Sequence, residues 1–105
     1  MKEVIAVFDI GKTNKKILLF DKDFQVVYEN SKRFKEIVDD DNYPCDDIVA
    51  IEKWIRDQIK TVQENDSFKL KAINFSTHGA TLMYLDKSGK KVTPLYNYLK
   101  LLDDM

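Results

Sequence analysis

Residues 4–21 read VIAVFDIGKTNKKILLFD and carry the clearest structural pattern of the sequence. An apolar run ends in the carboxylate of Asp9, turns through Gly11, and returns as a second apolar run. Two such runs joined by a short polar segment with a glycine are typical of antiparallel strands connected by a tight turn. The sequence therefore predicts a strand over residues 3–8, a turn, and a second strand over residues 16–20.

The turn is rich in groups that suit a phosphate. Three lysine ammonium groups supply positive charge, and a hydroxyl and a carboxamide supply neutral donors. A glycine among them lets the backbone approach a ligand closely. Ordinary hairpin tips use the same residue types, so a purely structural turn is the alternative. The candidate phosphate-binding residues are Gly11, Lys12, Thr13, Asn14, Lys15 and Lys16.

One carboxylate stands where the first strand gives way to the turn. Asp9 could hold a magnesium ion there, directly or through water, because hard oxygen ligands suit that metal. Asp9 is therefore the candidate metal ligand of the chain.

Beyond this turn, the sequence predicts a third strand, one helix and a fourth strand. A tight turn at residues 21–23 leads into a strand over residues 24–29, so three short-linked strands make an antiparallel meander. Apolar residues recur at three- and four-residue spacing over residues 47–64, which predicts an amphipathic helix. A strand over residues 69–76 follows and is expected to lie parallel to the first strand through a right-handed crossover. A C-terminal hairpin over residues 80–95 completes an α/β fold.

Burial is expected to follow these patterns. The near-continuous apolar run of the first strand predicts a central strand that is buried on both faces. Trp54 flanks the apolar stripe of the helix and could stack on a sugar, but this position favours packing in the core. The three acids Asp39 to Asp41 lack the spacing of a calcium-binding loop, so this acidic segment is predicted to be a solvated stretch of a loop over residues 39–47. Carboxylates near Cys45 are expected to raise the pKa of its thiol.

Composition excludes several classes of protein. Of the 105 residues, 44% are hydrophobic, which is ample for a packed core. The net charge of −1 predicts no general attraction to nucleic acid or to an anionic membrane. No stretch approaches the ~20 apolar residues that span a bilayer. We therefore expect a soluble protein. A single cysteine cannot form an internal disulfide, which fits the reducing cytoplasm.

Two polar segments leave neighbouring strands at the same edge of the predicted sheet. Asp9 and Gly11 follow the first strand, and His78 and Gly79 follow the strand parallel to it. Ligands of such sheets collect at the loops where parallel strands end. One shared site is therefore expected, although a single histidine at a strand end can also be a hydrogen-bonded structural residue.

Residues 9–16, DIGKTNKK, resemble the first phosphate motif of the FGGY carbohydrate kinases, which share the ATPase fold of actin, hexokinase and Hsp70. The residues that fall on the family pattern are Asp9, Gly11, Thr13 and Lys16, whereas Lys12 stands where a small residue is usual. Residues 73–82, INFSTHGATL, are similar to the family's strand and sugar-contact loop. An Asp-x-x-Gly turn at residues 86–89 follows as in the family, but Tyr98-Leu99-Lys100 replaces the usual aromatic-x-Asp.

The resemblance implies both a fold and an activity. The fold would be a ribonuclease H-like half-domain, with residues 1–105 as a partial N-terminal domain. The activity would be transfer of the ATP γ-phosphate to a sugar hydroxyl, with ATP and Mg2+ as cofactors and with His78 and Gly79 on the sugar. The catalytic aspartate and the second domain would lie beyond residue 105, so the chain holds no catalytic residue and is expected to be inactive alone. Its bare sheet edges would permit homo-oligomers.

Two other functions remain open at this stage. A ribonuclease H-like nuclease would bind two metal ions about 4 Å apart, between Asp9 and a helical acid such as Glu52. The charge balance lacks the basic track that nucleic acid requires. A non-catalytic binding or assembly module is the second alternative.

Overall fold

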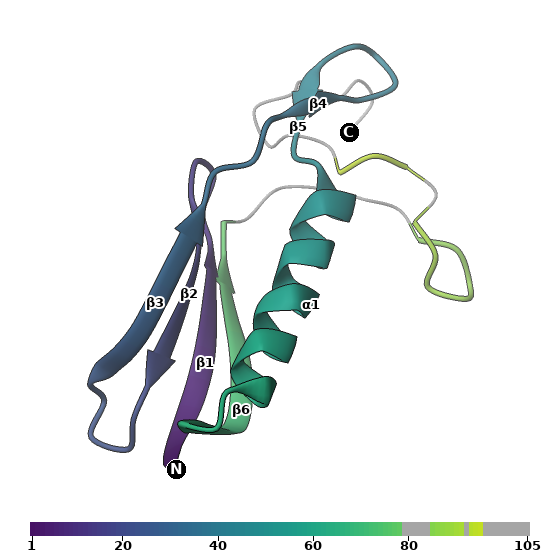
Figure 1. Ribbon diagram of the computed structural model, residues 1–105. Coiled ribbons are helices and arrows are strands. Elements are labelled where there is room, and N and C mark those ends of the chain that lie inside the picture. The colour runs from purple at the N-terminus through teal and green to yellow at the C-terminus, as the bar shows by residue number, and fades with distance from the viewer. Residues whose placement is uncertain (79–84, 92, 96–105) are drawn as a thin grey trace. The chain divides into compact units, whose positions relative to one another are not determined.

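The computed structural model describes residues 1–78, 85–91 and 93–95. The chain divides into two compact units, one of residues 1–34 and 50–78 and the other of residues 35–49 and 79–105. A four-stranded sheet with a helix along one face forms the first unit (Figure 1). The elements of this part of the chain are β1 (Lys2–Ile10), β2 (Lys15–Phe20), β3 (Val26–Lys32), α1 (Ile48–Glu64) and β6 (Phe68–Thr77).

The sheet has the order β3-β2-β1-β6. Strand β1 pairs antiparallel with β2, and β2 pairs antiparallel with β3. Strand β6 follows α1 and pairs parallel with β1. The predicted α/β class is therefore confirmed, and the ends of β1 and β6 reach the same edge of the sheet. The described helix is too short and too polar to cross a membrane.

Strand β3 begins at Val26 rather than at Phe24, because the preceding turn is longer than predicted. The N–H of Asp21 donates to the carbonyl oxygen of Gln25, and Oδ1 of Asp21 accepts the N–H of Gln25 in return. Within this turn Phe24 takes a φ of 61° and is 84% exposed. The expectation that the third strand covers residues 24–29 is therefore wrong at its start.

The core lies between the sheet and α1. Alternate residues of β1 and β2 point toward the helix, because successive side chains of a strand lie on opposite faces. Trp54 of α1 is buried, and its ring packs edge-on against Phe8 of β1 and against Phe34, with centroid distances of 5.9 Å to each. Trp54 is therefore a core residue, as its place on the helix predicts. The buried apolar residues of the cluster are Val4, Ala6, Phe8, Ile17, Leu19, Trp54 and Val62.

The first strand is buried on one face only, so the expectation of burial on both faces is wrong. The face toward α1 carries the buried residues of β1, whereas Ile5 on the other face is 44% exposed. Val7, on the same side as Ile5, is only partly buried. The apolar run correctly predicts that β1 is a central strand of the sheet. It does not indicate whether a second layer covers the other face.

The second unit contains a short hairpin around the acidic segment. Strands β4 (Ile37–Val38) and β5 (Pro44–Cys45) pair antiparallel, with the three acids at the tip. Cys45 is fully buried. Residues 39–42 carry no helix or strand, as predicted, although Asp39 is buried rather than solvated. The prediction of a loop over residues 39–47 is wrong for β5, because two-residue strands leave no readable alternation in a sequence.

The predicted turn at residues 86–89 is present. Leu85 and Lys91 form an antiparallel bridge, and Asp86 and Gly89 close the turn between them, with Gly89 at a φ of 86°. Residues 79–84, 92 and 96–105 lie outside the described part of the chain. The predicted contact of Gly79, residues 80–84 and 92 of the predicted hairpin, and the segment 98–100 therefore fall outside it.

Candidate functional site

The turn between β1 and β2 is held closed by its own backbone. The N–H of Gly11 donates to the carbonyl oxygen of Asn14 over 3.0 Å. A Cβ atom added to Gly11 would stand 2.9 Å from that same oxygen, closer than packed atoms allow. The turn itself therefore requires a glycine at this position, whether or not a ligand is bound.

The three lysines of the turn lie in different surroundings. Lys15 is only 1% exposed and shares the helix-facing side of β2 with Ile17. Its ammonium group donates to the carbonyl oxygen of Lys12 over 3.0 Å, so it ties the two ends of the turn together. Lys16 lies on the opposite face of β2 and is half-buried. Lys12 stands in the turn itself and is also half-buried.

Asp9 lies on the sheet face that points away from α1. It is exposed, and it pairs across the strands with Lys16 of β2 and with Ser76 of β6. Glu52, the second acid of the nuclease alternative, lies on α1 and forms an ion pair of 2.9 Å with Arg56. Because α1 covers the other face of the sheet, the structure does not bring Asp9 and Glu52 together.

His78 stands beside the residue that precedes the glycine of the turn. Its backbone N–H donates to the carbonyl oxygen of Ile10 over 3.4 Å, and its ring Nδ1 lies 3.2 Å from the same oxygen. A carbonyl oxygen only accepts hydrogen bonds, so Nδ1 must carry a hydrogen in this arrangement. In a neutral ring, Nε2 is then the acceptor. The structure thus brings the turn and His78 together at one edge of the sheet.

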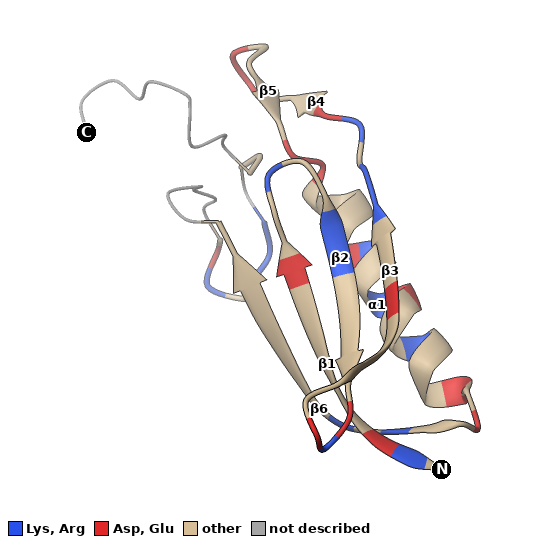
Figure 2. Ribbon diagram, turned by 90° about the vertical axis from the view of Figure 1, so that its left-hand side faces the viewer, with Lys and Arg blue, Asp and Glu red and all other residues tan. Residues whose placement is uncertain are grey.

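Sequence reasoning missed a further cation at this edge. Arg33 follows the end of β3, and its Nε donates to Oδ1 of Asn14 over 3.1 Å. Strand β3 reaches this far because Lys32 pairs with Lys15 at the start of β2. Figure 2 shows basic residues at the turn and at the adjoining ends of β2 and β3. The unusually basic end of the third strand, Lys32-Arg33, was the available signal.

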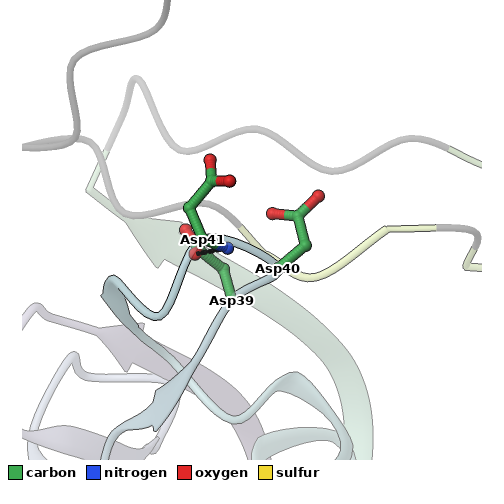
Figure 3. A group of neighbouring side chains, drawn as sticks. All are labelled: Asp39, Asp40 and Asp41. Carbon is green, nitrogen blue, oxygen red and sulfur yellow. Dashed lines mark hydrogen bonds between the residues drawn. The ribbon is translucent and has the colours of Figure 1, made fainter.

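Three acids of the second unit lie close enough together to hold a metal ion. The ligand atoms of Asp39, Asp40 and Asp41 are within 4.8 Å of one another. Figure 3 shows Asp39 turned back toward the N–H of Asp41, which donates to its Oδ1 over 2.8 Å. The same oxygen accepts the N–H of Tyr43 over 3.0 Å. These contacts give Asp39 a structural role at the tip of the hairpin.

The thiol of Cys45 behaves as its acidic surroundings predict, although burial is the larger cause. Loss of solvent raises the pKa of the Cys45 thiol, and the carboxylates of Asp39 and Asp46 raise it further. A thiol that stays protonated is a poor nucleophile and a poor metal ligand. Cys45 therefore has the surroundings of a structural cysteine.

The FGGY family of carbohydrate kinases, N-terminal domain, has a sequence profile that matches residues 4–100. The chain belongs to this family. The match includes both the turn after β1 and His78, the two segments that meet at the sheet edge. A comparison with curated protein sequences returned no match.

Solved structures of FGGY kinases have a similar fold. Gluconate kinase from Lactobacillus acidophilus matches with a TM-score of 0.73 and 22% identity over 90% of this chain and 20% of its own. Ligand-bound xylulose kinase from Lactobacillus acidophilus matches with a TM-score of 0.71 and 23% identity, over 89% of this chain and 19% of the xylulose kinase. Glycerol kinase from Plasmodium falciparum with ADP matches with a TM-score of 0.69 and 18% identity over 90% and 20%. The chain thus spans about a fifth of the length of these kinases.

Proposed function

We propose that this chain is the N-terminal part of an ATP-dependent sugar kinase that transfers the γ-phosphate of ATP to a sugar hydroxyl. The proposal rests on the contact of His78 with Ile10, because this contact joins the phosphate-type turn to the segment that resembles the family's sugar-contact loop, at one edge of the sheet. Phosphoryl transfer depends mainly on positioning and on stabilising charge, and both can be supplied by such an edge. The FGGY membership supports the same reaction class.

In this proposal the turn binds the phosphate groups of ATP. The bond from the Gly11 N–H to the Asn14 carbonyl oxygen holds the turn in shape, and Thr13 at the exposed tip offers a hydroxyl. Lys16 supplies a cation on the open face of the sheet. Lys12 adds positive charge at the tip, whereas Lys15 acts through its bond to the Lys12 carbonyl, which stabilises the shape of the turn.

Asp9 is the proposed ligand of Mg2+, directly or through water. Its exposed carboxylate suits the hard oxygen coordination of that ion, and its neighbour Lys16 would keep the phosphates close to it. Bound Mg2+ would neutralise charge on the transferred phosphoryl group. The acceptor sugar would lie near His78 and Gly79, with Nε2 of His78 accepting a hydrogen bond from a sugar hydroxyl.

Several broader features belong to the same proposal. The fold would be a ribonuclease H-like half-domain, and residues 1–105 would form part of the first of two domains, in a cytoplasmic enzyme. The catalytic base and the adenosine site would come from other parts of the enzyme, so the chain alone would be inactive, because affinity in this design depends on closure of two domains. Strands β3 and β6 are the outer strands of the sheet within the described residues, and the isolated chain would form homo-oligomers through them.

The test is sugar-dependent release of ADP from ATP. The protein encoded by the complete reading frame that contains this chain would be assayed against a panel of sugars, sugar acids and polyols with Mg2+. We expect one or a few compounds to stimulate ADP release, and we expect residues 1–105 alone to give none. Absence of stimulation across the panel, together with absence of ATP binding, would contradict the proposed function.

A further inference from the structure

The guanidinium group of Arg33 is fixed at the tip of the proposed phosphate turn by a contact that spans nineteen residues. Its Nε donates to Oδ1 of Asn14 over 3.1 Å. Both side chains are exposed, so they meet at the surface of the turn rather than in the core. An exposed pair of polar groups contributes little to the stability of the fold. A role in binding would account for the place of this pair at the turn.

This contact decides how the carboxamide of Asn14 is oriented. Arginine has five N–H donors and no acceptor, so only the oxygen of the Asn14 amide can face it. The NH2 group of Asn14 must then point away from Arg33. The pair as a whole therefore presents N–H donors and one positive charge, and it presents no acceptor apart from the oxygen already used.

A donor-only surface with positive charge is suited to an anion. Arg33 adds a planar group that can bind two phosphate oxygens at once, which a lysine cannot do. Lys12 stands in the same turn, and the backbone bond between Gly11 and Asn14 holds the turn in shape. No acid is within this turn or between Asn30 and Lys35 on the adjoining strand end.

We propose that Arg33 is a further residue of the phosphate site, acting with Asn14 as one anion-binding pair. The inference rests on the proposed function, since its ligand is the polyphosphate of ATP. Arg33 orients the Asn14 carboxamide and directs its own outer N–H groups to the phosphate. It thereby supplies a cation from outside the stretch of residues 9–16 that carries the phosphate motif.

The experiment compares the dissociation constants of Mg–ATP and of inorganic tripolyphosphate by titration calorimetry on the protein of the complete reading frame. We expect Arg33→Met to weaken the binding of both ligands roughly tenfold, because a charge-assisted hydrogen bond is lost. Arg33→Lys should recover only part of the affinity. Lys22→Met removes an equal charge at the opposite end of the sheet and should leave both affinities unchanged.

A double-mutant cycle separates this role from a merely structural one. If Arg33 acts through Asn14, the combined variant Arg33→Met with Asn14→Ala should lose less affinity than the sum of the two single losses. Melting temperatures of all variants should stay close to that of the unmodified protein. Equal affinities for Arg33→Met and Lys22→Met, with binding lost in Lys16→Met, would overturn this inference alone. Failure of the unmodified protein to bind either ligand would overturn it together with the proposed function.

Discussion

The ring of His78 is held against the carbonyl oxygen of Ile10, with Nδ1 at 3.2 Å. Ile10 ends β1 directly before the glycine of the turn, and His78 directly follows β6. Two segments that are 68 residues apart are thus joined at the edge where parallel strands end, the usual position of ligands in such sheets. The contact also places the hydrogen of a neutral ring on Nδ1, so that Nε2 is the nitrogen that accepts hydrogen bonds.

Replacing His78 should weaken the binding of the sugar and leave the binding of ATP nearly unchanged. We expect His78→Ala to raise the KM for the sugar about tenfold, since one hydrogen bond is lost, with a much smaller change in the KM for ATP. Steady-state kinetics with each substrate varied in turn measures both values. His78→Asn, whose NH2 group can still donate to Ile10, controls for the structural contact. A rise in the KM for ATP larger than that for the sugar would assign His78 elsewhere.

Replacing Gly11 should destabilise the turn through a steric clash rather than through an unfavourable backbone conformation. Gly11→Ala forces a Cβ against the carbonyl oxygen of Asn14, and we expect a loss of about 1–3 kcal/mol in the free energy of unfolding. Gly89→Ala is the matched control. A Cβ atom at residue 89 would meet nothing within 4 Å, but the alanine would have to adopt a backbone φ of 86°. Its expected cost is about 1–2 kcal/mol. Urea denaturation measures both, and only Gly11→Ala should also impair ATP binding.

Replacing Trp54 should weaken the packing of α1 on the sheet. Its ring packs against Phe8 and Phe34, so Trp54→Ala is expected to cost about 3–5 kcal/mol in the free energy of unfolding. Val49→Ala on the same helix is the control, because Val49 is 64% exposed and its truncation should change stability by less than about 0.5 kcal/mol. Similar denaturation midpoints for the two variants would contradict the described core.

The local parts of this fold are the parts that the sequence predicts well. The turn at Gly11 is read from residue types within a few positions, and the helix stripe is read from its period. The burial of Lys15 could also have been predicted, because it stands two residues before Ile17 on the same side of β2. Its identity as a lysine masked the pattern, since a strand-end lysine is usually solvated.

The parts that were missed depend on distant contacts or on very short elements. Arg33 meets Asn14 only because β3 extends to Lys32, and the end of an edge strand is not marked by hydrophobic alternation. The hairpin of β4 and β5 is too short to carry a period. Whether a second layer covers Ile5 depends on the rest of the fold and not on the composition of β1.

Asp21 should make stability depend on pH in the acid range. The N–H of Gln25, followed by that of Asp23, holds the pKa of the Asp21 carboxyl below its usual value. A lowered pKa means that the stabilisation is present above the ordinary pKa and is lost as pH falls through the lowered one. Asp21→Asn keeps the shape and removes the charge. We expect the variant to be less stable than the unmodified protein at pH 7 and the two to converge near pH 2, as measured by urea denaturation.

Binding of the ATP phosphates by the turn after β1 can be tested through the affinity of the Lys16→Met variant for Mg–ATP. Titration calorimetry on the protein of the complete reading frame would compare this variant with Lys22→Met. We expect Lys16→Met to weaken Mg–ATP binding tenfold or more, roughly the contribution of one charged hydrogen bond, and Lys22→Met to leave it unchanged. Equal affinities in the two variants would contradict phosphate binding by the turn.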